Sequence, residues 1–296
     1  MSVQAAENRS NQFENLDLVF EPQHQVVWAR FRYAERPCMS QSLLRDVAAA
    51  QQLIVEQATR EYHAGNSGRL KYQVLGSAMK GVFSLGGDLA HFVELIRRGD
   101  RDQLKVYATA CVEVLYRSAT SYGLPFTTIS LVQGEALGGG FEAALSANLL
   151  IAEKQSRFGF PETVFGLFPG MGAFSFLARR LNPGLAKRLI SSGKVHTAEE
   201  LYDMGVVDLL VEEGEGEEAV YDYIQRQKTR SSGLYALDKV VEQYNPLKYE
   251  ELIDVVDLWV DTALELSPKN LRLMEYLVAA QRRRWVDTTH LRSVVV

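Results

Sequence analysis

The sequence predicts an α/β fold that ends in a helical region. Short segments rich in β-branched and apolar residues alternate with amphipathic helical segments as far as residue 213. Beyond Gly214 the pattern is helical throughout, with long amphipathic stretches at 247–266 and 269–284. Alternating strands and helices followed by helices alone are typical of an α/β core with a helical layer. We therefore expect a core over residues 1–213, with an N-terminal hairpin and helix, and a C-terminal helical region over residues 214–296.

The first half of the chain contains four recognisable elements. Residues 16–33 read as two strands around a Pro-Gln-His turn. Ser40 is placed to cap a helix that runs to about Glu61. A β-prone segment over 70–79 follows, and then two helical stretches at 89–98 and 101–122. These patterns predict a hairpin, a long helix, a strand and a pair of helices.

The second half begins with a nearly apolar segment at 125–134, which suits a strand buried on both faces. A helix over 139–148 and a strand over 149–154 are expected next, followed by helices near 173–180 and 185–191. The stretch TAEELYDMG reads as a capped helix closed by Gly205, before a strand over 206–213.

Composition excludes several classes of protein. The 296 residues are 47% hydrophobic and 23% charged, as in ordinary globular proteins. The net charge of −5 gives no general nucleic-acid or anionic-membrane footprint. The polar N-terminus lacks a signal sequence and no apolar run suggests a membrane span, so a cytoplasmic location is expected. Two distant cysteines and five scattered histidines indicate neither a disulfide framework nor a metal site, and no cofactor is predicted.

The stretch QGEALGGGFEAALSANLL places three glycines directly before an apolar helix that contains Glu142. At a strand-to-helix junction, unpaired N–H groups and the positive end of the helix dipole point forward. Glycine lets another group approach this backbone closely. The turn therefore suits an anion, or an oxygen that becomes anionic during a reaction. Taken alone, the three glycines are better explained by a tight turn that lets a helix pack closely on a sheet.

A second carboxylate favours the functional explanation of this turn over simple packing. Glu162 lies twenty residues later in an apolar, glycine-rich loop, and the intervening helix and strand can bring the chain back. A buried glutamate is costly without a partner or a purpose. A second glycine turn, FSLGGD, also ends a strand and opens a helix. Two such turns can each supply one N–H to a single oxygen, which predicts an oxyanion hole beside two carboxylates.

Four segments resemble the enoyl-CoA hydratase/isomerase (crotonase) superfamily over about residues 70–213. They are FSLGGD, VQGEALGGGFEAALSANLLIAE, FGFPETVFGLFPGMGA and SSGKVHTAEELYDMGVVDLLV. Within it, the chain is most similar to the diffusible signal factor synthases, bacterial enzymes that make cis-2-unsaturated fatty-acid signals. LGGDLAHFVELIRRGDRDQL and WVDTALELSPKNLRLMEYLVAAQRRR carry much of that similarity. The resemblance implies a crotonase-like spiral of ββα units, a thioester-binding site in the 1–213 catalytic core and a C-terminal helical trimerisation region.

The resemblance also implies roles for individual residues. Glu142 and Glu162 match the paired acid/base glutamates, and Gly139 matches one donor of the oxyanion hole. Leu85 or Gly86 matches the other donor; Leu85 stands where hydratases commonly have a small residue. The residues expected to contact the acyl group are Leu137, Gly138, Met171 and Trp259, although core packing explains several of them as well.

The implied reaction is dehydration of a 3-hydroxyacyl thioester and hydrolysis of the thioester to a free cis-2-unsaturated acid. The expected partners are an acyl thioester on carrier protein or CoA, further copies in a homotrimer or dimer of trimers, and a signalling sensor protein. An enoyl-CoA hydratase of fatty-acid metabolism is the first alternative, and a non-catalytic signalling scaffold is the second. The presence of both carboxylates argues against an isomerase that uses a single base.

Overall fold

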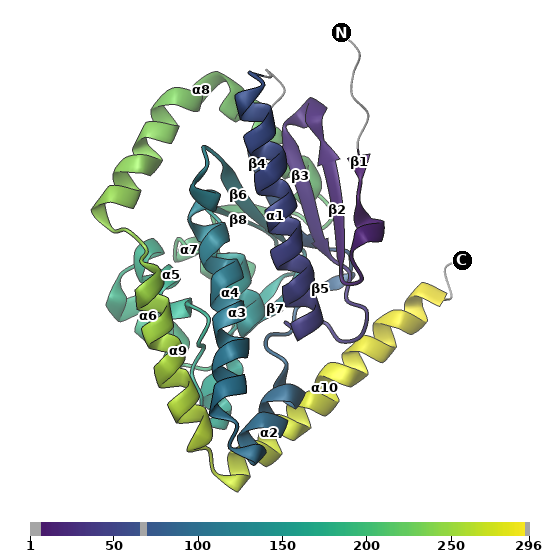
Figure 1. Cartoon of the computed structure of the whole chain (residues 1–296), viewed down its shortest axis with the longest axis vertical. Coiled ribbons are helices and arrows are strands. Elements are labelled where there is room, and N and C mark those ends of the chain that lie inside the picture. Colours follow the sequence, from purple (N-terminus) through teal and green to yellow (C-terminus); the bar gives the residue numbers. More distant parts are fainter. Residues whose placement is uncertain (1–6, 66–69, 294–296) are drawn as a thin grey trace.

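Two β-sheets lie at the centre of the fold, and helices pack around them (Figure 1). The computed structural model describes residues 7–65 and 70–293. The first six residues of the polar N-terminal stretch therefore lie outside the described part of the chain. The observed α/β architecture, with helices at the C-terminal end, confirms the predicted fold class.

The larger sheet has seven strands in the order β1-β2-β3-β4-β6-β8-β11. They are β1 (Glu7–Asn8), β2 (Leu16–Glu21), β3 (Val26–Phe31), β4 (Tyr72–Ser77), β6 (Thr127–Val132), β8 (Leu149–Glu153) and β11 (Leu209–Val211). β2 and β3 form the expected hairpin, and every pair from β3 to β11 is parallel. Helices cover parallel strands on both faces, which explains the nearly continuous apolar character of β6 and β8.

The smaller sheet has four short strands in the order β10-β9-β7-β5. They are β5 (Gly81–Ser84), β7 (Gly134–Leu137), β9 (Arg157–Gly159) and β10 (Val195–Thr197). The sequence pattern did not separate β7, β9 and β10 from their turns, because three or four residues are too few to display an alternation. β5 pairs with β7 and β7 with β9 in parallel, so their carboxyl ends lie along one edge of this sheet.

Ten α-helices surround the sheets in the described part of the chain. They are α1 (Gln41–His63), α2 (Leu89–Arg98), α3 (Arg101–Ala119), α4 (Gly139–Leu145), α5 (Ala173–Arg180), α6 (Pro183–Ser191), α7 (Ala198–Asp203), α8 (Gly216–Tyr244), α9 (Tyr249–Leu264) and α10 (Pro268–Ser293). Short 3-10 helices are η1 (Ser10–Gln12), η2 (Pro22–His24), η3 (Ser121–Gly123) and η4 (Pro161–Phe165).

Local signals set several helix ends as expected. The Ser40 hydroxyl accepts from the N–H of Leu43 at the start of α1, and Thr197 forms a capping box at the start of α7. α3 ends at Ala119, three residues earlier than expected, because Ser121 and Tyr122 have left-handed φ angles of 51° and 58°. α4 likewise ends at Leu145 rather than at residue 148.

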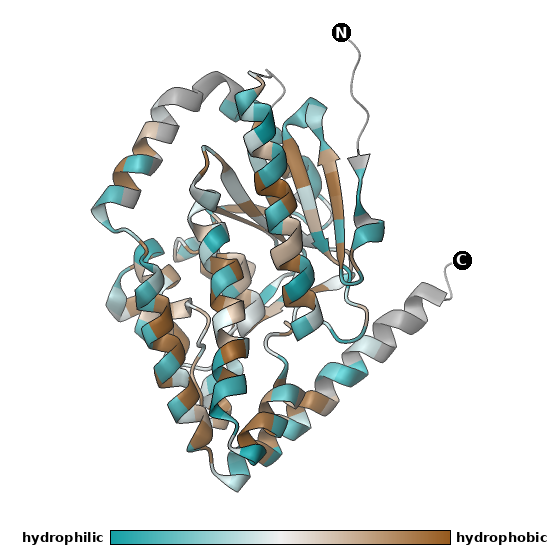
Figure 2. Ribbon diagram, viewed as in Figure 1, coloured by the Kyte–Doolittle hydropathy of each residue, from teal (hydrophilic) through white to brown (hydrophobic). Residues whose placement is uncertain are grey.

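The C-terminal helices complete the main hydrophobic core. Buried residues of α9 and α10, including Trp259, Val260 and Met274, belong to the same cluster as residues of α1–α5. Figure 2 shows hydrophobic positions along α9 and α3, which pack against each other. The boundary at residue 213 stays a prediction. None of the described helices combines the length and the apolar character that a membrane span requires.

Candidate active site

The two glycine turns meet where β5 and β7 end. A Cβ on Gly86 would stand 3.5 Å from the nitrogen of Gly139, and a Cβ on Gly139 would stand 3.5 Å from the nitrogen of Gly87. Gly86 and Gly138 have φ angles of 98° and 50°, which residues with side chains rarely adopt. Glycine is therefore required both for the backbone path and for the close approach of the two turns.

The sequence predicts Leu85 or Gly86 as the second N–H donor, but both of these N–H groups already have partners within the protein, whereas that of Gly87 has none among the described residues. The N–H of Leu85 donates to the Pro37 carbonyl at 2.7 Å, and that of Gly86 is directed at the Ser84 hydroxyl at 3.4 Å. Within the described residues, the N–H groups of Gly87 and Gly139 have no protein acceptor, and both residues line a pocket. The sequence FSLGGD contains several adjacent N–H groups, and the contact with Pro37 could not be read from it.

Glu142 lies in the first turn of α4 with 1% of its surface exposed. Its Oε1 accepts hydrogen bonds from the N–H groups of Met171 at 2.7 Å and Ala173 at 2.9 Å. Burial raises the pKa of Glu142 to about 7, while the N–H groups of Ala173, Met171 and Gly172 oppose that rise. The carboxyl group can therefore be charged or neutral near neutral pH.

Glu162 lies in η4, and its carboxyl group contacts Gly138, where a Cβ would overlap Oε1. Oε2 is buried and has no hydrogen-bond partner in the described part of the chain. Burial and the nearby charge of Glu142 together raise the pKa of Glu162 to about 8. The two carboxyl groups differ in environment: the backbone N–H groups of Ala173, Met171 and Gly172 stabilise the charge of Glu142, whereas only its own backbone N–H stabilises that of Glu162.

A pocket of about 40 Å³ is lined by Glu142 and Glu162 and by the two residues with free N–H groups, Gly87 and Gly139. The other lining residues are mostly apolar: Leu89, Phe92, Tyr107, Ala108, Phe165, Leu167, Gly170, Met171 and Trp259. Met171 and Trp259, two of the residues predicted to contact the acyl group, are among these lining residues, and their role stays a prediction. Leu137, Gly138, Leu85 and Gly86 lie at the adjacent turns and do not line the pocket.

The pocket is nearly filled by large side chains that cover glycines. The Met171 sulfur lies 2.6 Å from the Cβ position of Gly139, and Trp259 covers Gly170 in the same way. Trp259 also packs edge-on against Phe92 with 5.0 Å between ring centroids. Since ligand pockets usually measure roughly 300–1,000 Å³, an acyl group must displace some of these side chains to enter.

This arrangement supports acid/base chemistry beside a stabilised oxyanion. Two N–H groups converge from separate turns, and two carboxyl groups of different basicity face the same apolar pocket. In the described ranges, no group of three or more His, Cys, Asp or Glu residues is arranged to hold a metal ion.

Curated relatives share about half of this chain. "Probable enoyl-CoA hydratase 2, mitochondrial" of Arabidopsis thaliana is 30% identical over 172 residues, which cover 58% of this chain and 54% of that protein. "Fatty acid oxidation complex subunit alpha" of Pseudomonas syringae pv. tomato is 32% identical over 153 residues, or 52% of this chain and 21% of that protein. The matched region thus spans about half of these relatives or less.

Solved structures share the fold over nearly the whole chain. An enoyl-CoA hydratase from Bacillus halodurans superposes with a TM-score of 0.72 at 19% identity, covering 88% of this chain and 99% of its own. An enoyl-CoA hydratase/isomerase from Xanthobacter autotrophicus Py2 gives 0.72 at 20% identity, covering 95% and 98%. The family described as "Enoyl-CoA hydratase/isomerase" matches residues 50–251, more than half of the sequence. The chain therefore belongs to the enoyl-CoA hydratase/isomerase family.

Proposed function

We propose that this protein catalyses the reversible addition of water to the C2–C3 double bond of an enoyl thioester, as an enoyl-CoA hydratase does. The observation that carries the proposal is the pair of unlike carboxyl groups, Glu142 and Glu162, beside the free N–H groups of Gly87 and Gly139. Family membership and the names of the relatives support the same reaction.

The thioester carbonyl oxygen would occupy the space between Gly87 and Gly139. During hydration this oxygen acquires the negative charge of an enolate, and the two N–H groups stabilise that charge. Removal of one such donor typically lowers the rate by roughly 10²–10³. Because both donors are backbone groups held by glycine turns, they are already oriented before the substrate arrives.

The two carboxyl groups take opposite parts in the proton transfers. Glu142, whose charge is stabilised by backbone N–H groups, acts as the base that takes a proton from water as the water oxygen bonds to C3. Glu162, whose pKa of about 8 keeps it protonated at neutral pH, delivers its proton to C2. The pair then exchanges one proton through solvent, and the reverse sequence dehydrates a 3-hydroxyacyl thioester.

The test is to incubate the purified protein with 2-enoyl-CoA substrates of four to sixteen carbons. Hydration removes the absorbance of the conjugated thioester, and mass spectrometry identifies the 3-hydroxyacyl-CoA formed. Heat-inactivated protein serves as the control. If every substrate remains unchanged at micromolar enzyme, the proposed function is wrong.

A second candidate is synthesis of a cis-2-unsaturated fatty-acid signal from a 3-hydroxyacyl thioester. It requires hydrolysis of the thioester as well as dehydration. The observation that favours it is the unpaired, buried Oε2 of Glu162 in an apolar pocket that has room for a few water molecules. A water held there could attack the thioester carbonyl, with its oxygen in the same oxyanion hole. The resemblance of the segments after Val82 to diffusible signal factor synthases supports the same candidate.

Product analysis separates the two candidates. The protein is incubated with 3-hydroxyacyl carrier protein and, in parallel, with 3-hydroxyacyl-CoA, and the released fatty acids are measured by mass spectrometry. Free cis-2-unsaturated acid supports signal synthesis. Thioester products without free acid exclude it and leave the hydratase reaction.

A further inference from the structure

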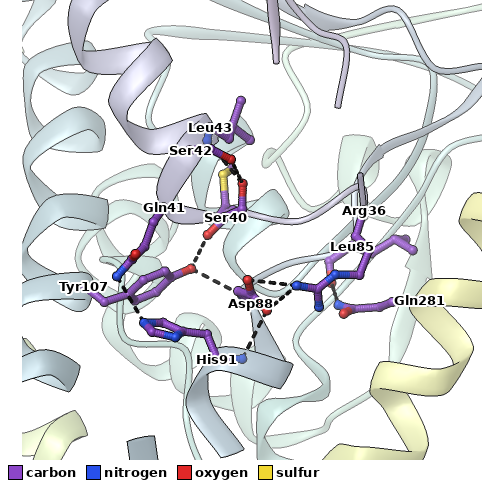
Figure 3. A network of polar contacts seen from close by, with 11 residues as sticks. Arg36, Ser40, Gln41, Ser42, Leu43, Leu85, Asp88, His91, Tyr107 and Gln281 are labelled. Atoms are coloured by element: carbon purple, nitrogen blue, oxygen red, sulfur yellow. Dashed lines mark hydrogen bonds and ion pairs between the residues drawn. The ribbon is translucent and has the colours of Figure 1, made fainter. Parts of the chain in front are cut away.

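We propose that Arg36 and Tyr107 are positioning residues that aim the N–H of Gly87 into the pocket. Neither residue was singled out by its sequence context. Both belong to a network of polar contacts around the turn at residues 85–88 (Figure 3). The inference rests on the proposed function, because it assigns the Gly87 N–H to the thioester oxygen.

The direction of the Gly87 N–H is set by the carbonyl of Gly86. In a trans peptide the C=O and the N–H that follows point in opposite directions. The Gly86 carbonyl accepts a hydrogen bond from the N–H of Met39 at 2.8 Å. The Gly87 N–H must therefore point away from Met39, and Gly87 lines the pocket on that other side. The contacts that hold Met39 against Gly86 therefore also set the direction of the Gly87 N–H.

Tyr107 joins Met39 to the end of the turn. Its hydroxyl donates to the Met39 carbonyl and accepts from the N–H of Asp88 at 3.2 Å. Burial raises the pKa of Tyr107 well above its ordinary value, so the hydroxyl keeps the proton that it donates. One side chain of α3 thus bridges the loop at residues 36–39 and the turn at residues 85–88.

Arg36 supplies the second link between the same two segments. Its Nη2 lies 3.0 Å from each oxygen of the Asp88 carboxylate, with 16% and 11% of the two side chains exposed. Asp88 also caps α2 by accepting from the N–H of His91 at 3.2 Å. The ion pair therefore fixes the loop, the turn and the start of α2 together, as Figure 3 shows.

The turn needs this external support because it contains two glycines in succession. Gly86 has a φ of 98°, and glycine has more backbone freedom than any other residue. Among the described residues, the other polar backbone groups of residues 85–88 are held as well, and the Leu85 carbonyl accepts from the buried Gln281 of α10 at 2.9 Å. Only the Gly87 N–H remains for a ligand. Loss of the Arg36–Asp88 ion pair or of the Tyr107 hydrogen bonds lets the Gly86–Gly87 peptide rotate, so that the Gly87 N–H no longer points into the pocket.

The experiment compares Arg36→Met, Arg36→Lys and Tyr107→Phe with the wild type. Arg36 uses one nitrogen for both contacts, and its buried Nη1 has no partner in the described part of the chain. Lysine can therefore restore the single-nitrogen ion pair. Arg98→Met, which removes the ion pairs of the exposed Arg98 with Glu94 and Asp100 at the other end of α2, is the matched control.

Two quantities are measured for correctly folded protein. The first is kcat and KM for hydration; we expect kcat to fall roughly 10- to 100-fold in Arg36→Met and Tyr107→Phe, with little change in KM. The second is the infrared carbonyl stretch of bound 2-enoyl-CoA, measured with each change in a Glu162→Gln background that does not consume the ligand. We expect its shift to low frequency to shrink in both variants and to recover in Arg36→Lys.

Failure of the positioning role and failure of the proposed function give different results. If wild type hydrates the substrate but both variants keep its kcat and carbonyl frequency, the positioning role is wrong. If the wild type neither hydrates the substrate nor shifts its carbonyl stretch, the proposed function itself fails. Should Arg36→Met not fold, Tyr107→Phe and Arg36→Lys carry the same test.

Discussion

Replacing Glu162 with glutamine should make the protein more stable in alkaline solution while it abolishes activity. The Oε2 atom of Glu162 is buried without a partner among the described residues, and the charge of Glu142 lies nearby. Ionisation of Glu162 in the folded protein is therefore unfavourable. Glutamine has the same shape and carries no charge, so it removes this cost.

The size and sign of this change in stability follow from the pKa of Glu162. The folded-state pKa is raised from 4.5 to about 8. Between these values the folded state retains a proton that the unfolded chain releases, so the stability of the wild type falls as pH rises through that window. The full shift corresponds to at most about 5 kcal/mol. Because the side chain is only partly buried, solvent reduces the cost, and we expect a gain of roughly 1–3 kcal/mol above pH 8.

The assay is equilibrium unfolding in urea at pH 5.5, 7 and 8.5. The difference in unfolding free energy between Glu162→Gln and wild type should be small at pH 5.5 and largest at pH 8.5. Glu199→Gln, an exposed position on α7, is the control and should show no such trend. A difference that does not grow with pH, or a variant less stable than wild type at pH 8.5, would refute the reasoning.

Four further predictions follow from the site and the fold. The pH profile of kcat/KM should be bell-shaped with its maximum between about 7 and 8, since Glu142 must be ionised and Glu162 protonated; a rate that is flat from pH 6 to 9 contradicts this. Gly140→Ala, whose Cβ would stand 2.5 Å from the Ser84 carbonyl oxygen, should cost about 1–3 kcal/mol and reduce kcat, whereas Gly184→Ala at an exposed site should do neither. The preferred acyl chain should have about twelve carbons, because each methylene buried in the apolar pocket contributes about 0.8 kcal/mol, and Trp259→Ala should shift this preference to longer chains; an optimum at four carbons, or no response to the substitution, argues against burial of the acyl chain beside Trp259. Light scattering should give a trimer or a dimer of trimers, in which exposed apolar residues such as Leu258 and Tyr276 become covered; a monomer at micromolar concentration contradicts this.

Elements with strong local signals could be predicted from the sequence. The cap at Ser40 predicts the start of α1, the capping residue Thr197 predicts that of α7, and a largely β-branched and apolar run predicts β6. The short strand β7 could not be predicted, because its four residues pair with β5 and β9 from distant parts of the chain. Tertiary pairing, not local preference, makes these residues a strand.

The candidate site could likewise be predicted only where it does not depend on contacts between distant parts of the chain. The glycine turns and the two glutamates stood out because glycine runs and buried carboxylates are costly without a reason. Which N–H of FSLGGD faces the pocket depends on Pro37 and Met39, which are about fifty residues away along the chain. Arg36 and Tyr107 look like ordinary loop and helix residues in the sequence, and only their contacts with Asp88 distinguish them.

Hydration of a 2-enoyl-CoA in D₂O by the wild type, Glu142→Gln and Glu162→Gln tests the central claim most directly. In Glu142→Gln the amide oxygen of the new side chain can still accept from Met171 and Ala173, so both variants should fold. The wild type should place one deuterium at C2 of the 3-hydroxyacyl product, and each variant should lose roughly 10²–10⁴ in rate, because an amide cannot exchange the proton. Wild-type rates in either variant would remove that carboxyl group from the mechanism, and no turnover by the wild type would contradict the proposed hydratase reaction itself.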